Sequence, residues 1–175
     1  VVAETNGTVN ITATVSPTLT FSNDDATVGF GTLTSGAARW ANGAASGSAS
    51  TTTAHTMAVG TNATTGYTLT YNGPTLTSGA NTITAATITG DNDGTPGSAQ
   101  FALGVTVTGT GTASAGYQTG SNNYNFVPST ASQVASATGP VTSDSIAVRY
   151  IANIPASQPA GNYATDLVYV ATGNF

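Results

Sequence analysis

Apolar and polar residues alternate along much of this chain with a period of two, which is the period of a β-strand. The clearest example lies near the N-terminus, where every even position from 10 to 20 is Asn, Ser or Thr. Because side chains of an extended chain point alternately to opposite sides, this segment has one polar edge and one apolar edge. The apolar edge consists of Val9, Ile11, Ala13, Val15, Pro17, Leu19 and Phe21.

Pro17 interrupts the alternating segment. Proline has no backbone N–H to donate to a β-ladder, so it marks a bulge, an edge position or a break between two strands. We expect the segment to act as two pieces, residues 9–15 and 19–21, of which only the first need leave the fold of its own chain.

Shorter strand candidates follow along the chain, separated by turn-forming Gly, Pro, Asn and Asp residues. The best of them places Tyr67, Leu69 and Tyr71 on one face, and two more place alternate residues of 146–154 and of 163–171 on one face each. The remaining candidates are residues 27–33, 55–59, 82–89, 101–108 and 124–127.

These patterns together predict the fold class. No segment has a convincing helical period, so the crossover helices of a parallel α/β sheet are absent. We predict an all-β fold, an Ig-like or jelly-roll β-sandwich of about eight to ten strands. Residues 1–22 are expected to form an extended N-terminal segment and residues 23–175 the sandwich domain, in which the Gly-, Ala- and Ser-rich stretch 35–50 is a loosely structured loop.

The charge of the chain narrows the function classes. Charged residues make up only 5% of the sequence, against about 25% in an average protein. There is no lysine, and Arg39 and Arg149 are the only cations apart from any contribution of His55. Two cations cannot form the basic surface that nucleic acids or anionic lipids require. No apolar run approaches the length of a transmembrane helix.

The remaining composition favours a sheet protein outside the cell. Threonine, a β-branched residue suited to pleated sheets, is the most frequent residue of the chain. We expect a hydroxyl-rich, uncharged exterior. The sequence starts with Val1 rather than Met, as a processed mature N-terminus does. The expected location is therefore extracellular or at the cell surface.

Residues for catalysis are scarce. His55 is the only candidate general base, and it lies in a plain strand context, where we expect a solvent-facing histidine rather than a catalytic one. No Gly-x-Ser-x-Gly elbow is present. Four of the seven acidic residues are paired in turns, where Asp needs no functional explanation. We predict a protein that is not an enzyme.

Two small-site candidates remain. Asp91 and Asp93 open a stretch that begins like a calcium loop, but position 12 of the EF-hand pattern falls on Ala102, which offers no carboxylate. The alternatives are an irregular calcium site and a turn stabilised by Asp and Asn side chains. Trp40, next to Arg39, is a candidate contact for surface glycans, the alternative being a tryptophan that covers one end of the sandwich.

Self-assembly is the leading functional interpretation. Soluble proteins commonly protect exposed sheet edges with charged residues, and this chain has almost none. An amphipathic terminal segment can add a strand to a neighbour's sheet while its alternate side chains fill the neighbour's core. We therefore expect a homopolymer of identical copies, in which the donor-strand residues are Val9, Ile11, Ala13, Val15, Leu19 and Phe21. The alternative is that this segment is simply the first strand of its own sandwich.

Two motifs add a resemblance. Phe30-Gly31-Thr32-Leu33 and the stretch 159–170, which contains Ala-Gly-Asn-Tyr, resemble secreted fimbrial-type domains of the spore-coat-U-like and archaic chaperone–usher pilin groups. The resemblance implies Ig-like subunits joined by donated strands. Such pilins often carry a disulfide, whereas this chain has no cysteine.

The sequence therefore predicts a structural subunit of an extracellular, pilus-like filament, which polymerises by donating its N-terminal strand. The alternative is a monomeric surface adhesin or carbohydrate-binding module.

Overall fold

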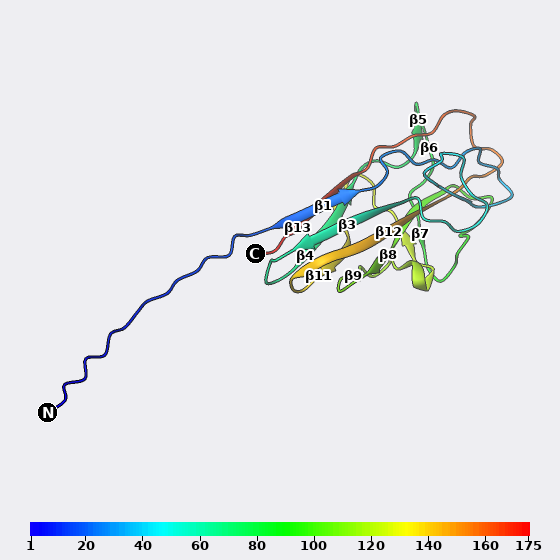
Figure 1. Ribbon diagram of the computed structural model, residues 1–175. Helices are drawn as coiled ribbons and strands as arrows, with labels where there is room; N and C mark the ends of the chain where they lie inside the picture. Colours follow the sequence, from blue (N-terminus) through cyan, green and yellow to red (C-terminus); the bar gives the residue numbers. More distant parts are fainter.

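The computed structural model describes residues 1–175 and contains thirteen β-strands, one 3₁₀ turn (Thr119–Ser121) and no α-helix (Figure 1). No helix is present that could cross a lipid bilayer. The strands are β1 (Leu19–Asn23), β2 (Arg39–Trp40), β3 (His55–Thr61), β4 (Tyr67–Asn72), β5 (Thr77–Ser78), β6 (Asn81–Thr82), β7 (Thr87–Ile88), β8 (Gln100–Thr108), β9 (Thr112–Ala113), β10 (Tyr124–Asn125), β11 (Ser132–Ala137), β12 (Val141–Asn153) and β13 (Val168–Gly173).

Two antiparallel sheets pack face to face, which confirms the predicted all-β sandwich. The larger sheet has the order β1-β3-β12-β8-β10-β7, and β2 also pairs with β12. The smaller sheet has the order β13-β4-β11-β9, and β5 and β6 form a separate hairpin. The strands outnumber the predicted eight to ten because six of them contain only two residues.

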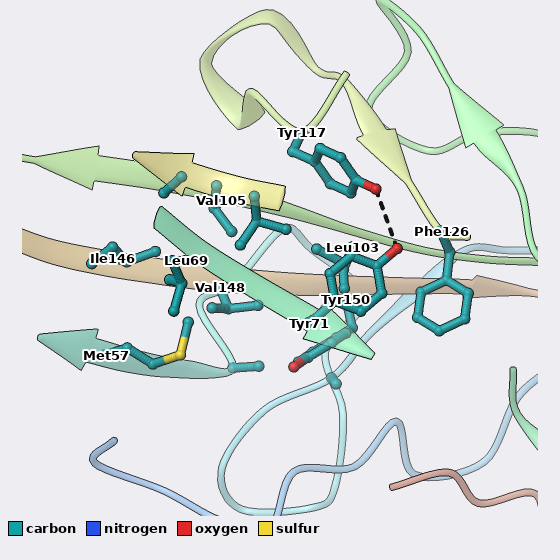
Figure 2. Close-up of a cluster of buried hydrophobic side chains, with 14 of the residues drawn as sticks. Met57, Leu69, Tyr71, Leu103, Val105, Tyr117, Phe126, Ile146, Val148 and Tyr150 are labelled. Carbon is teal, nitrogen blue, oxygen red and sulfur yellow. Dashed lines mark hydrogen bonds between the residues drawn. The ribbon is translucent and has the colours of Figure 1, made fainter. Parts of the chain in front are cut away.

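The main core lies between the two sheets (Figure 2). β12 contributes Ile146, Val148 and Tyr150 from one side, and β4 contributes Leu69 and Tyr71 from the other. The predicted same-face positions on both strands are thus confirmed. All of these side chains are buried, and each apolar side chain of this size stabilises the fold by about 1.5–3 kcal/mol.

A second, smaller apolar cluster covers the outer face of the larger sheet. Trp40 packs edge-to-face against Tyr124, with ring centroids 5.1 Å apart, above Ile151 of β12. The stretch 35–50 is consequently better ordered than predicted. Asn42 Oδ1 accepts hydrogen bonds from the backbone N–H groups of Ser46 and Gly47, both at 3.1 Å, and closes a tight loop against the sheet.

Several strands differ from the predictions. Residues 27–33 form only isolated bridges, at Gly29 and Phe30, and the only strands within residues 82–89 are the end of β6 and the two-residue β7. β12 begins at Val141 rather than at residue 146. The last strand, β13, begins at Val168 rather than at residue 163, because residues 163–167 make only a single bridge, between Ala164 and Thr77. β11 was not among the predicted strands, since its Ser- and Ala-rich sequence has little alternation.

The N-terminal extended segment ends earlier than the predicted residue 22. Residues 1–18 form no strand, are exposed throughout and project away from the sandwich (Figure 1). Residues 19–23 form β1, which pairs with β3 in the register Leu19↔Thr61 to Asn23↔Met57. We call residues 1–18 the N-terminal tail.

Candidate functional site

The tail carries large apolar side chains that the rest of the chain does not cover. Val9, Ile11 and Val15 are 80%, 86% and 83% exposed, and Ala13 between them is exposed as well. By contrast, the other two predicted donor residues, Leu19 and Phe21, lie in β1 and are 38% and 41% exposed. The structure therefore separates the alternating segment at Pro17.

Asn62 holds the root of the tail. Its side-chain Nδ2 donates to the carbonyl of Ser16 at 2.8 Å, and its Oδ1 accepts from the backbone N–H of Thr18 at 2.8 Å. The backbone N–H of Asn62 also donates to the carbonyl of Thr18 at 3.3 Å. These bonds lie on both sides of Pro17 and keep the tail extended in line with β1.

One side of the sandwich has two unpaired strand edges next to each other. β1 is the last strand of the larger sheet and β13 the last strand of the smaller one, and the two are neighbours in space (Figure 1). They run in opposite directions, because Thr18 before β1 and Asn174 after β13 both hydrogen-bond to the β3–β4 connection. We call the gap between β1 and β13 the open seam.

The core-facing side chains along the open seam are incompletely covered. Phe21 is paired with Val59, a fully buried residue, so its ring points to the core side of the sheet. It is nevertheless 41% exposed. On the opposite strand Tyr169 faces the core, but the next two core-facing positions are held by the small residues Ala171 and Gly173, which pair with Leu69 and Tyr67. The seam therefore lacks the side chains that would complete the core there.

At one end, the open seam widens into a cleft of about 930 Å³. Two wall segments, residues 25–33 and 158–167, enclose it. The walls contribute Phe30, Leu33, Tyr163 and Leu167, all of them partly exposed. The two motifs that resemble fimbrial domains lie in these wall segments. The sequence analysis therefore identified part of the lining, although it did not predict a cleft.

A chain of hydrogen bonds forms the polar floor of the cleft. His55 Nδ1 lies 2.7 Å from Asn23 Oδ1, which can only accept, so Nδ1 carries the hydrogen. His55 Nε2 then accepts from the hydroxyl of Tyr150 at 2.9 Å, and that oxygen accepts from Tyr169 at 2.7 Å. Each polar side-chain atom in this series of hydrogen bonds therefore has a partner within the protein.

The environment of His55 differs from the expected solvent-facing one. The residue is only 6% exposed, because Tyr150 stacks on its ring and Tyr169 packs edge-on. Burial lowers the pKa of His55 below its ordinary value, an effect that Asp24 and Asp25 partly offset. Burial likewise raises the pKa of Tyr150 and of Tyr169. The histidine is thus held in its neutral form.

Asp144 is the one fully buried acid, and it stabilises a turn. Its Oδ1 accepts from the backbone N–H of Thr110 at 2.8 Å, and its Oδ2 accepts from the N–H of Gly111 at 2.8 Å and from the hydroxyl of Tyr67 at 2.9 Å. This carboxylate links the β8–β9 connection to both sheets.

Trp40 cannot serve as the predicted glycan contact. Its side chain has no solvent exposure, since it is covered in the cluster on the outer face of the larger sheet. The sequence placed Trp40 in a Gly- and Ala-rich stretch that looked like an exposed loop, and the hydrogen bonds of that loop bring it onto the sheet instead. The prediction of a ligand contact at Trp40 is wrong for this conformation.

Asp91 and Asp93 form a local turn. Asp91 Oδ1 accepts from the backbone N–H of Asp93 at 3.0 Å, the Asx-type bond expected of Asp in turns. No group of three or more His, Cys, Asp or Glu residues gathers in a geometry that could hold a metal ion. The bond agrees with the alternative of a turn stabilised by Asp and Asn side chains, and calcium binding at Asp91 and Asp93 stays a prediction.

The three comparisons with known proteins found no match for this chain. No protein-family model matches it, and the searches of curated proteins and of solved structures also return no match.

Proposed function

We propose that this protein is a structural subunit of an extracellular, pilus-like filament that polymerises by donating its N-terminal tail to the next copy. The observation that carries the proposal is the exposure of Val9, Ile11 and Val15 on one edge of an extended tail. Isolated apolar residues on a surface are ordinary, but a continuous apolar edge on an extended segment with an unpaired backbone can pair with another sheet.

Burial of this edge contributes a driving force for assembly. Covering a Val or Ile side chain contributes about 1.5–3 kcal/mol as an upper bound. Backbone hydrogen bonds to an acceptor strand would add to this. The tail and any acceptor surface are different parts of the chain, so the contact is heterologous and repeats without closing, which produces a fibre.

The charge-poor surface supports the same proposal. Two edges of the sandwich, β1 and β13, lie open, and neither strand contains a charged residue. Charges, especially lysines, are the usual means by which soluble proteins prevent strand addition at such edges. Their absence permits copies of this chain to join through strand edges.

Two variants of the tail test the proposal. Ile11→Asp puts a charge on the apolar edge, and Thr12→Asp, its matched control, puts the same charge on the polar edge of the same strand. We expect filaments of the wild type and of Thr12→Asp by negative-stain microscopy, and particles without filaments for Ile11→Asp. Absence of filaments for the wild type, or equal filaments for both variants, would contradict the proposal.

In addition to the tyrosines, the alternative of a monomeric carbohydrate-binding module had Trp40 as its main candidate contact. Burial of that side chain removes its principal contact residue. Light scattering separates the two functions, because a binding module stays monomeric at concentrations at which a filament subunit polymerises.

A further inference from the structure

We propose that the cleft between wall segments 25–33 and 158–167 is the docking groove for residues 9–15 of a second copy. The donated segment enters from the cleft end and runs antiparallel to the chain that leads into β13. This inference rests on the proposed function and assigns its acceptor surface, direction and position.

The position of the tail in the molecule points to the cleft. The tail leaves at the end where Thr18 and Asn174 bond to the β3–β4 connection. The cleft lies at the opposite end, beyond the end of β1 and before the start of β13, since Asn23 and Leu167 line it. In a head-to-tail arrangement, the tail of one copy therefore meets the cleft of the next copy first.

The reach of the tail agrees with this placement. An extended chain advances about 3.3 Å per residue, so Val15 lies about 10 Å from Thr18 and Val9 about 30 Å from it. These residues fall on the part of the neighbour nearest to the tail root, which is the cleft and the start of β13.

The direction of the donated segment follows from the same geometry. Its C-terminal end stays at the entrance and its N-terminal end reaches deeper, so it runs opposite to residues 163–173 of the acceptor and parallel to β1. Antiparallel pairing is slightly more stable per residue than parallel pairing, which favours the β13 side. Val15 accordingly lies near the cleft entrance, and Val9 lies near Tyr169.

The chemistry of the two surfaces matches. The cleft walls present Phe30, Leu33 and Leu167 without an unpaired polar group on the floor, because the hydrogen bonds of His55 and its partners are complete. The tail has no charged side chain between residues 5 and 18. Its apolar edge therefore brings no charge of its own into the cleft, whose lining also includes Asp25 and Asp166, while its Thr and Asn residues face solvent.

Photochemical crosslinking tests this assignment in assembled, full-length protein. Val9, Ile11 and Val15 are replaced one at a time by the photoreactive residue benzoylphenylalanine, with Thr12 as the matched control on the polar edge. Labelled and unlabelled protein are mixed before assembly, so that mass spectrometry separates crosslinks between copies from crosslinks within one. We expect inter-copy crosslinks from position 15 to residues 25–33 or 158–163, and from position 9 to residues 166–170, with about tenfold less product from position 12.

The outcomes separate the two proposals. Filaments whose crosslinks from position 15 map to residues 170–175, to β1 alone or to the same copy overturn the cleft assignment and leave the filament function standing. Absence of filaments in the wild type overturns the function itself. A second pair of variants tests the assignment if crosslinking yields too little product. Leu33→Asp in the cleft wall should reduce filament yield about tenfold, whereas Val127→Asp, outside the cleft, should not. Equal yields with native circular dichroism spectra for both would also overturn the assignment.

Discussion

The side-chain Oδ1 of Asn62 lies 2.8 Å from the backbone nitrogen of Thr18, and its Nδ2 lies 2.8 Å from the carbonyl oxygen of Ser16. One side chain thus bonds the backbone on both sides of Pro17. A proline has no N–H of its own, so these bonds replace the ladder contacts that β1 would otherwise continue. The direction in which the tail leaves the sandwich depends on this residue.

Replacement of Asn62 by alanine should impair assembly more than folding. Two hydrogen bonds at an exposed site contribute about 0.5–1.5 kcal/mol each at most, so the midpoint of thermal unfolding should change little. The freed tail samples many directions, and ordering it on binding then costs more conformational entropy. We expect a higher critical concentration for filament formation, measured by sedimentation. Asn81→Ala, an exposed asparagine of β6, is the control, and equal critical concentrations for the two variants would contradict a role of Asn62 in assembly.

Deletion of residues 1–18 should leave a folded monomer. No residue of this tail is buried, and its hydrogen bonds with the sandwich are those of Asn62 and of the Thr61 hydroxyl, which donates to the carbonyl of Thr18 at 2.9 Å. Circular dichroism should show the wild-type spectrum, and light scattering should show a single small species. Deletion of residues 1–23 also removes β1 and uncovers the edge of β3, so this variant should unfold at a lower temperature. Polymers formed by the 1–18 deletion would show that assembly uses another surface.

Alternation of side chains made the long strands predictable. Four strands could be predicted because one face of each lies in the main core, so that apolar residues recur at every second position of the sequence. These strands are β3, β4, β8 and β12. β11 was missed because its core residues are mainly alanines among serines. Residues 163–167 continue the alternation without being a strand, since they line the cleft instead of pairing with β4.

The parts of the candidate site differ in the same way. The apolar edge of the tail was visible because it is local and repeats over seven residues around Ile11. The bonds of Asn62 join residues 44 and 46 positions apart, and no local pattern signals them. For Trp40 the local sequence was misleading. Its flanking Gly and Ala residues suggested an exposed loop, whereas the folded loop brings it over Ile151.

Asp144→Asn should destabilise the sandwich strongly. Its carboxylate accepts from two backbone N–H groups and from Tyr67, and the amide of asparagine would direct its own N–H₂ at one of these donors. A buried donor without an acceptor costs about 1–3 kcal/mol, so we expect a loss of about 2 kcal/mol in the free energy of unfolding by urea titration. Asp166→Asn, at an exposed position, should stay within about 0.5 kcal/mol of the wild type. Equal stability of the two variants would show that the turn does not depend on the carboxylate.

The stability of the protein should fall as the pH drops below the ordinary histidine value of 6.5. Burial lowers the pKa of His55 in the folded state, so between the two pKa values the unfolded chain binds a proton that the folded chain does not. Acid therefore favours the unfolded state, starting at about pH 6.5 and continuing until the pH reaches the folded pKa. Burial is the main cause of the lowered pKa, and a proton on Nε2 would also displace the hydrogen bond that Tyr150 donates to it.

Urea titrations between pH 7.5 and 5.5 measure this effect, because this range covers the ordinary histidine value of 6.5. His55→Gln is the matched variant, since a glutamine can donate to Asn23 and accept from Tyr150 but takes up no proton in this range. The free energy of unfolding should decrease with falling pH for the wild type and stay level for the variant. A parallel decrease in both would assign the pH dependence to groups other than His55, and a wild type that becomes more stable at pH 5.5 would reverse the sign of the argument.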